Sequence, residues 1–159
     1  MKKIIAFEDI GAILPLITKK NKVLVGGCFD VFHYGHLTFL KNAKREGDFL
    51  IVALESDEFI KKHKKRDPIH NQNQRAEILS ANIFVDMVVV LPLLKSNEEY
   101  FHLVKLIKPS VIATTEGDPQ LDNKKRQAQT VSGQVKVVTR QLPHFASSRI
   151  DPYETFSRS

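Results

Sequence analysis

The amino-acid sequence predicts an α/β fold in which an open parallel sheet lies between two layers of helices. Two observations lead to this fold class. Short apolar runs of strand length alternate along the chain with segments whose apolar residues have helical spacing. The apolar runs also contain few polar residues, as strands covered on both faces do. Strands that alternate with helices in this way are joined by crossovers into a parallel sheet.

Five strands are expected in this sheet. Residues 22–26 (KVLVG) form a short β-branched run that ends in glycine, and Phe49–Leu54 (FLIVAL) is apolar throughout. Residues 86–91 (DMVVVL) have the same character. The last two strands are expected at residues 110–113 and 135–139. The result is a Rossmann-like open parallel five-stranded sheet with helices on both faces.

Four helices are expected to connect these strands, at residues 34–46, 73–82, 98–107 and 124–132. Gly47 and Gly133 follow the first and the last of them, in the position of a C-cap. The chain of 159 residues suits a single domain, 1–159, with a core at 22–150. We expect a leading helix within residues 1–21 and a polar tail at 151–159.

The amino-acid composition indicates the cellular compartment and the kind of binding partner to expect. The single cysteine, Cys28, cannot form an internal disulfide, and no apolar run is long enough to span a membrane, so we expect a cytoplasmic protein without a membrane partner. The formal charge of +6 favours anionic partners, either nucleic acid or phosphorylated metabolites. Net charge alone does not choose between them.

A glycine- and histidine-rich segment, GGCFDVFHYGH, follows the first strand directly. Ligands of open parallel sheets bind at the carboxyl ends of the strands, so the chemistry is expected here. His33 and His36 lie three residues apart at the start of a helix, whose free N–H groups attract anions. Gly35 between them leaves room for a phosphate. A phosphate site is favoured over a metal site, because Asp30 is the one further metal ligand nearby.

This segment resembles the signature of the HxGH nucleotidyltransferase superfamily, which includes cytidylyltransferases and several adenylyltransferases. The resemblance extends to SDEFIKKHKKRDPI, RAEIL, TEGDP and SSRI, which occur in the family's order across residues 22–150. The leading helix, the Gly-Cys-Phe-Asp sequence and the RAEIL helix resemble heptose-1-phosphate adenylyltransferases. Glycerol-3-phosphate cytidylyltransferases are similar enough to remain an alternative, and archaeal-type FAD synthases are a more distant one.

The resemblance implies direct transfer of a nucleoside monophosphate, from ATP or CTP, to a small phosphorylated acceptor, with release of pyrophosphate. His33, His36 and Lys64 are then the expected catalytic residues, although a shift of one residue would exchange Lys65 for Lys64. The residues expected to bind the nucleotide are Gly27, Cys28, Phe29, Asp30, Gly35, Arg66, Arg75, Glu116, Asp118, Ser147 and Ser148. Mg²⁺ bridging the phosphates is expected without an evident protein ligand, and a homodimer is expected from the family.

Several residues have competing interpretations. In isolation, the basic run from Lys61 to Arg66 is more typical of a solvated surface than of a binding site. Glu116–Asp118 is as typical of a simple turn as of a nucleotide-binding segment. Ala146 replaces an expected hydroxyl residue and Ile83 replaces an arginine of the cytidylyltransferases, which leaves an inactive nucleotide-binding regulator as an alternative.

Two further questions concern partners. The acceptor pocket is expected near Phe101, His102 and the segment after Pro119, although helix packing explains Phe101 equally well. A nucleic-acid partner is not expected, because the basic run contains no interleaved aromatic residues.

Overall fold

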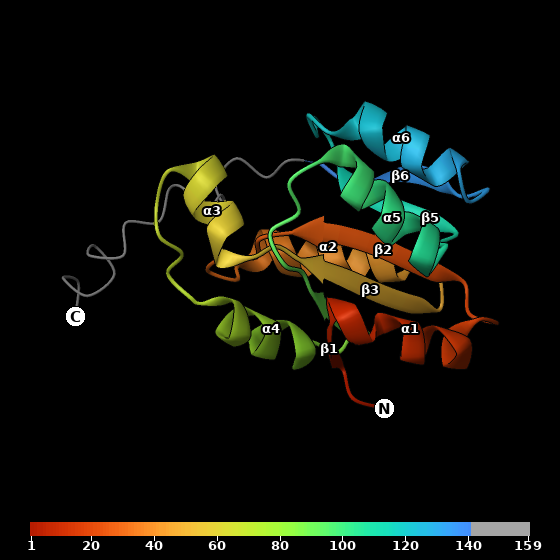
Figure 1. The fold of residues 1–159 in the computed structure, drawn as a ribbon, viewed down its shortest axis with the longest axis horizontal. Helices are drawn as coiled ribbons and strands as arrows, with labels where there is room; N and C mark the ends of the chain where they lie inside the picture. The colour runs from red at the N-terminus through yellow and green to blue at the C-terminus, as the bar shows by residue number, and fades with distance from the viewer. Residues whose placement is uncertain (141–159) are drawn as a thin grey trace.

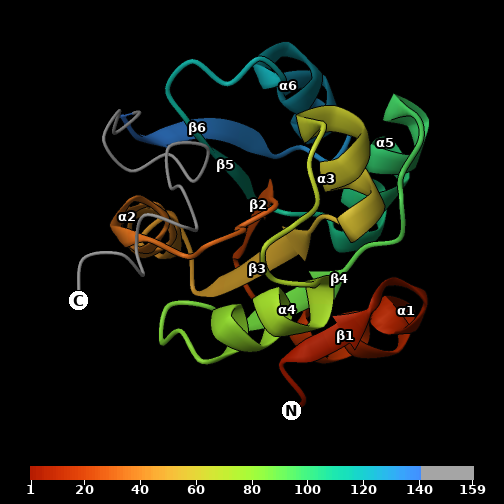
Figure 2. The same cartoon turned by 90° about the vertical axis from the view of Figure 1, so that its left-hand side faces the viewer.

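The computed structural model describes residues 1–140 and shows a six-stranded, fully parallel sheet with helices on both faces (Figures 1 and 2). The strands are β1 (Ile4–Ala6), β2 (Lys22–Gly27), β3 (Phe49–Leu54), β4 (Met87–Val90), β5 (Val111–Thr115) and β6 (Gln134–Thr139). Their order across the sheet is β1-β4-β3-β2-β5-β6. The predicted α/β class is therefore confirmed, and the predicted count of five strands is one too low.

The additional strand is β1, which pairs with β4 through Ile4 and Val88 at the edge of the sheet. The leading helix expected within residues 1–21 corresponds to a helical stretch at 7–17, which β1 precedes. After β1 the chain makes three short helical segments, η1 (Phe7–Asp9), α1 (Ile10–Ile13) and η2 (Leu14–Ile17). Pro15 lies at the start of the last one, where a missing N–H is tolerated.

The other helices are α2 (Tyr34–Lys44), α3 (Asp57–Lys64), α4 (Gln72–Ser80), α5 (Asn97–Ile107) and α6 (Leu121–Gln129). Four were expected, with ends that differ by a few residues. Helix α3 was not expected, because the sequence analysis assigned no helix to the segment that contains the basic run from Lys61 to Arg66. Ser56 accepts a hydrogen bond from the N–H of Phe59 and caps this helix. Lys65 ends it in the left-handed conformation, with φ 56°.

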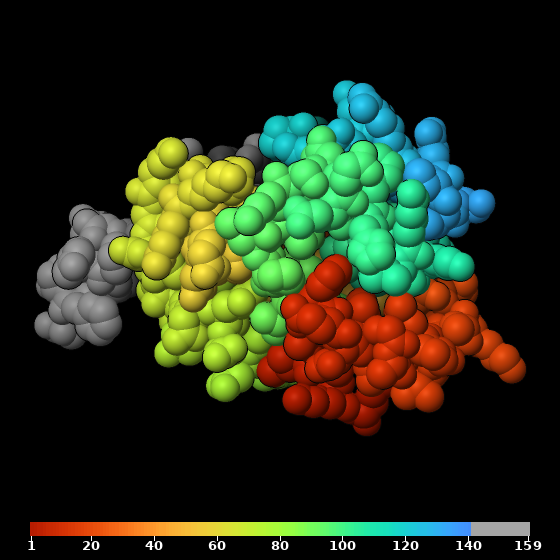
Figure 3. Space-filling view, viewed as in Figure 1, coloured from red at the N-terminus to blue at the C-terminus, as the bar shows by residue number. Residues whose placement is uncertain are grey.

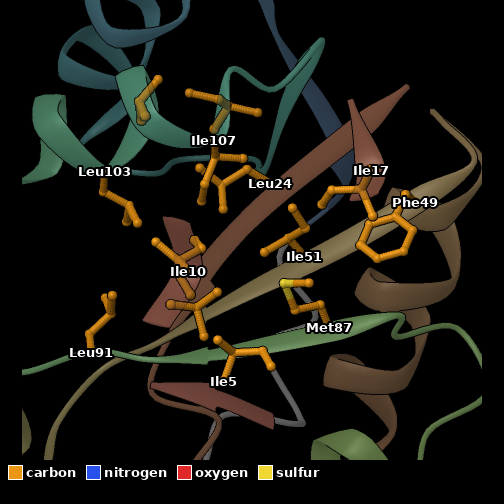
Figure 4. Packing of buried hydrophobic residues seen from close by; sticks show 14 of the residues in the cluster. Ile5, Ile10, Ile17, Leu24, Phe49, Ile51, Met87, Leu91, Leu103 and Ile107 are labelled. Atoms are coloured by element: carbon orange, nitrogen blue, oxygen red, sulfur yellow. The ribbon is translucent and has the colours of Figure 1, made fainter. Parts of the chain in front are cut away.

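Two hydrophobic cores fill the layers above and below the sheet. Alternate side chains of each strand point to opposite faces, so neighbouring residues such as Leu50 and Ile51 belong to different cores. One core packs the sheet against the N-terminal segment, α5 and α6, and Figure 4 shows Ile10, Ile17, Leu103 and Ile107 meeting the strands there. The other packs the sheet against α2 and α4. In the space-filling view the N-terminal segment (red) and α5 (green) lie side by side (Figure 3).

The strand order reverses at β2. The chain passes from β2 to β3 and β4 on one side, and then returns to place β5 on the other side. The pairing of β2 with β5 extends only over Val23 and Leu24. Beyond Leu24 the two strands separate, which opens a crevice at their carboxyl ends. Helix α3 lies across that end of the sheet (Figure 2).

Candidate functional site

A pocket of about 200 Å³ occupies this crevice. The ends of β2 and β5, the loop after β2, and helices α2, α3 and α6 all contribute to its wall. Its lining residues are Gly26, Gly27, Cys28, Phe29, Asp30, His36, Phe39, Lys64, Thr114, Thr115, Asp118 and Lys124. The structure therefore brings His36, Lys64 and Asp118 to one place from three separate parts of the sequence. We call this the small pocket.

The loop after β2 has a strained backbone. Phe29 and Val31 have φ values of 48° and 55°, and the left-handed region is unfavourable for both and most of all for the β-branched valine. A Cβ on Gly27 would lie 3.0 Å from the Phe29 ring, which is a tight contact, so the ring would have to shift by a few tenths of an ångström to accept it. Strain of this kind persists where the surroundings hold the chain firmly, as they do around binding sites.

Asp30 holds this loop in place. Its buried carboxylate accepts hydrogen bonds from Arg66 Nη1 at 2.6 Å and from the N–H groups of Ile69 and His70 at 3.1 and 3.0 Å. Burial by itself raises the pKa of Asp30, but these bonds outweigh it and lower the pKa. Asp30 and Arg66 thus tie the glycine-rich loop to the segment after α3, and Arg66 does not line the small pocket.

His33 and His36 form a stacked pair at the start of α2, with ring centroids 3.8 Å apart. His33 is the N-cap, and its Nδ1 accepts from the N–H groups of Gly35 at 3.1 Å and His36 at 3.4 Å. A neutral imidazole whose Nδ1 accepts carries its proton on Nε2. Burial lowers the pKa of His33, and burial together with the charges of His33 and Lys64 lowers the pKa of His36 to about 3. Both rings are therefore neutral hydrogen-bond donors at pH 7.

Arg75 is placed differently from the expectation that it contacts phosphate. Its side chain is completely buried, and its guanidinium donates to the carbonyl oxygens of Cys28 (2.6 Å), Glu55 (2.9 Å) and His70 (3.0 Å). It also forms an ion pair with Asp57 at 2.7 Å. Arg75 therefore holds together the loop after β2, the end of β3 and the start of α3, and acts on the site through these elements.

Replacing Arg75 with methionine is expected to lower the free energy of unfolding by about 3–5 kcal/mol, because buried carbonyl groups would be left without a donor and the half-buried Asp57 would lose its ion pair. Urea unfolding followed by circular dichroism measures this change. The exposed Arg45 provides a matched control, and Arg45→Met is expected to stay within about 0.5 kcal/mol of the wild type. A loss below about 1 kcal/mol for Arg75→Met would contradict the conclusion that Arg75 holds these three segments together.

The opposite wall of the small pocket holds a cluster from β5 and α6. Asp118 accepts hydrogen bonds from Thr114 Oγ1 and Lys124 Nζ and from the N–H of Gln120. Burial raises the pKa of Asp118, and the bonds from Lys124 and Thr114 more than compensate and lower it. Sequence reasoning missed Thr114 and Lys124, because Lys124 is six residues beyond Asp118 and reaches it only through the turn into α6.

A larger cavity of about 640 Å³ adjoins the small pocket. The two share Gly26, Gly27, Cys28 and Lys124 in their walls. Buried apolar side chains from the strands and from α5 form much of the cavity wall: Leu24, Ala53, Leu91, Leu94, Leu103, Val104 and Ile112. Polar residues from α3, α6, the start of α5 and the segment before α5 also line it, among them Lys62, His63, Lys95, Ser96, Asn97 and Asn123. We call this the large cavity.

Glu55 and Tyr100 form a buried polar pair in the wall of the large cavity. Tyr100 donates its hydroxyl to Glu55 Oε1 at 2.8 Å, and Glu55 Oε2 has no hydrogen-bond partner among residues 1–140. Burial raises the pKa of Glu55 to about 7, although Tyr100, Arg75 and Lys124 oppose the rise. Among the residues that the sequence analysis named for the acceptor pocket, Phe101 and His102 line neither pocket. The segment after Pro119 contributes Gln120, Asn123 and Lys124 to the large cavity, and Tyr100 was not among the named residues.

Other predicted residues lie outside both pockets. Gly35 contributes its N–H to His33, and Glu116 is exposed on the turn after β5. Ser147, Ser148 and Ala146 lie outside the described residues. Ile83 is 84% exposed and lines neither pocket. The departure from the cytidylyltransferase pattern at Ile83 therefore does not change the walls of the site.

Within residues 1–140, no group of three or more His, Cys, Asp or Glu side chains could hold a metal ion. In the same part of the chain, no helix is both long and apolar enough to cross a bilayer.

Comparison with known proteins identifies related sequences. A family model described as cytidylyltransferase-like matches residues 24–157. The FAD synthase of Pyrococcus horikoshii is 42% identical over 127 residues, which cover 79% of this chain and 82% of that protein. The bifunctional protein HldE of Campylobacter jejuni subsp. doylei is 40% identical over 114 residues, which cover 70% of this chain but only 23% of HldE.

Solved structures share the fold. The lipopolysaccharide core biosynthesis protein from Thermoplasma volcanium superposes with a TM-score of 0.61 and 24% identity, covering 77% of this chain and 97% of that one. Pantoate-beta-alanine ligase from Francisella tularensis gives a TM-score of 0.66 with 16% identity, covering 90% of this chain and 69% of that one. At these identities the likeness shows the Rossmann-like fold alone.

Proposed function

The chain belongs to the cytidylyltransferase-like family and is a nucleotidyltransferase, and we propose that it transfers the adenylyl group of ATP to the phosphate of flavin mononucleotide (FMN). The products are flavin adenine dinucleotide and pyrophosphate. The observation that carries this proposal is the large cavity with its apolar wall, which opens beside the small pocket. The similarity to the FAD synthase of Pyrococcus horikoshii supports it.

The two pockets suit the two substrates of such a transfer. The small pocket has His36, the first turn of α2 and Lys64, all suited to phosphate groups. His33 does not line the pocket and stacks against His36 as the N-cap of α2. The acceptor then occupies the large cavity, and its phosphate meets the α-phosphorus of the nucleotide where the pockets join, at Gly26–Cys28 and Lys124. The acceptor oxygen attacks in line, a new P–O bond forms, and the bond to pyrophosphate breaks. Positioning and charge stabilisation are the main requirements, since the attacking phosphate is already ionised.

The wall of the large cavity favours a flavin over a sugar as the acceptor. Leu24, Leu103 and Ile112 are each at most 5% exposed and present hydrocarbon to the cavity. A fused aromatic ring system gains free energy from burial against such a surface. A sugar hydroxyl placed against this apolar part of the wall would lose its water without gaining a hydrogen-bond partner. The polar residues of the wall, Ser96 and Asn123 among them, are available to hydroxyl groups of either acceptor.

The expected Mg²⁺ ion is assigned to the nucleotide in this proposal. Residues 1–140 provide no cluster of ligands for a metal ion. Magnesium keeps most of its water and is commonly held by substrate phosphates. The ion would then enter with the triphosphate and reduce its negative charge.

A second candidate is transfer to heptose-1-phosphate, which the sequence favoured through its resemblance to heptose-1-phosphate adenylyltransferases. The 40% identity to HldE supports this candidate. Its weakness is the apolar part of the large-cavity wall, where a sugar gains less free energy from burial than a fused aromatic ring does.

The test is an assay of pyrophosphate release with purified protein and Mg²⁺. ATP and CTP are each combined with FMN, heptose-1-phosphate and glycerol-3-phosphate, and the products are identified by mass spectrometry. We expect turnover with ATP and FMN. Turnover with heptose-1-phosphate instead would move the activity to the second candidate, and turnover with CTP and glycerol-3-phosphate would support the cytidylyltransferase alternative. Thermal stabilisation by nucleotide without turnover of any pair would favour a regulator.

A further inference from the structure

The backbone N–H and the carbonyl group of Glu55 are both hydrogen-bonded, close to where the two pockets join. Glu55 is the first residue after β3, its N–H donates to the Gly27 carbonyl at 3.0 Å, and its own carbonyl accepts from Arg75 at 2.9 Å. Glu55 lines the large cavity and not the small pocket. The backbone bonds therefore hold this acidic side chain on the acceptor side of the site.

The Glu55 side chain lacks one hydrogen bond within the protein. Oε1 accepts from Tyr100, whereas Oε2 is buried and has no partner among residues 1–140. The residue is only 7% exposed. Buried carboxylate oxygens are nearly always hydrogen-bonded, and a group without a partner in a ligand cavity is explained when the ligand supplies the donor.

We infer that Glu55 is a specificity-determining residue whose Oε2 accepts a hydrogen bond from an N–H group on the ring edge of the acceptor, while Tyr100 holds the carboxyl group in orientation. The inference rests on the proposed function, because the flavin ring carries an imide N–H of this kind. The apolar residues around the pair, Leu24 and Leu103 among them, pack against the rest of the ring. The same contact would reject an acceptor whose ring nitrogen carries no hydrogen.

The charges of the cavity exclude a simpler explanation, in which Glu55 binds a cationic acceptor. Lys62, Lys95 and Lys124 line the same cavity, and Glu55 is the one acidic side chain in its described wall. The cavity is therefore positive overall, and it suits an acceptor that carries phosphate. Glu55 is left to accept a hydrogen bond from a neutral donor group of the acceptor molecule.

The experiment compares FMN with FMN methylated at the imide nitrogen, using the unmodified protein and Glu55→Gln. Glutamine keeps the size of the side chain. When its one oxygen accepts from Tyr100, its NH₂ group occupies the position of Oε2 and cannot accept a hydrogen bond from the ring N–H. Wild-type protein is expected to prefer FMN by about 10²-fold in kcat/KM. Glu55→Gln is expected to raise KM for FMN by about 10-fold, to leave KM for ATP unchanged and to lose most of the preference.

Glu58→Gln is the matched control, because Glu58 lies three residues further on, is exposed and lines neither pocket. It is expected to behave like the wild type with both flavins. Equal use of both flavins by the wild type would overturn the inference and leave the proposed function intact, as would identical behaviour of Glu55→Gln and Glu58→Gln. Failure of the wild type to use either flavin would overturn the proposed function itself. The methylated flavin tests the contact in unmodified protein, so the result does not depend on the variant folding.

The pH dependence of KM for FMN tests whether Glu55 contacts the acceptor, because a purely structural role of Glu55 would not produce it. The groups that face Glu55 are Tyr100 on α5, Arg75 on α4, Lys124 on α6 and Cys28 after β2, and Lys62, His63 and Lys95 line the same cavity. Because burial raises the pKa of Glu55 to about 7, the accepting carboxylate form is lost as pH falls through that value. As the pH is lowered from 8 to 6, KM for FMN is therefore expected to rise in the wild type and to rise less in Glu55→Gln. The phosphate of FMN titrates near pH ~6 in both proteins, so the difference between them reports on Glu55.

Discussion

Replacing His36 with alanine is expected to lower kcat for pyrophosphate release by about 10²–10³-fold, with a smaller change in KM for the nucleotide. The ring of His36 lines the small pocket beside Gly27 and Lys64. Its Nδ1 is buried without a hydrogen-bond partner among residues 1–140, so we expect Nε2 to be the nitrogen that reaches a phosphate oxygen. A donor fixed by packing stabilises the charge that develops during transfer without having to reorient.

The pH profile separates this role from acid–base catalysis. Burial, together with the charges of His33 and Lys64, lowers the pKa of His36 to about 3, so the imidazole stays neutral above that value. The His36 ring is therefore expected to add no inflection to log kcat between pH 5 and pH 8. An inflection that disappears in His36→Ala would contradict the assignment of a neutral donor.

Two matched variants control for structural effects. His33→Asn keeps a side chain that caps α2 well while removing the imidazole Nε2, and so separates the cap from the donor. His102→Ala removes an exposed histidine on α5 and is expected to match the wild type. If His36→Ala retained more than about a tenth of wild-type kcat, the ring would not be a major phosphate donor.

The parts of the fold that the sequence predicted are those with a local physical cause. Phe49–Leu54 is recognisable as a buried strand because every residue is apolar, and the glycine-rich loop is recognisable because its composition differs so sharply from its surroundings. The three residues of β1 were missed because so short a run has no periodicity and gains its order from pairing with β4. Helix α3 carried a usable signal in Ser56 and its acidic first turn, but the family motif favoured a loop.

The site was less predictable because it depends on burial and on contacts between distant segments. Arg75 was expected at the phosphates because a charged residue in a motif suggests a ligand, and only the fold shows that three carbonyl groups and Asp57 surround it. The large cavity depends on the separation of β2 from β5 after Leu24 and on where α5 lies. No local pattern in the sequence records either of these.

Lys64 and Lys65 provide the second large prediction, because the sequence left the choice between them open. Lys64 lines the small pocket, and its charge contributes with burial to lowering the pKa of His36 and opposes the rise that burial causes in the pKa of Cys28. It forms no ion pair with residues 1–140. Both lysines are exposed, but Lys65 ends α3 in the left-handed conformation and lines neither pocket. The geometry therefore favours Lys64 as the cation that contacts the phosphates.

We expect Lys64→Met to lower kcat/KM for the nucleotide by about 10²–10³-fold, and Lys65→Met to stay within about twofold of the wild type. Both variants remove one charge from adjacent positions, so a general effect of net charge would change them equally. The unequal loss is therefore specific to the position of the ammonium group. Steady-state kinetics at two salt concentrations completes the comparison, because the screening of a distant surface charge changes with salt much more than a contact inside the pocket does. The reverse pattern, with Lys65→Met inactive and Lys64→Met active, would mean that α3 extends by one residue or rotates when the nucleotide binds.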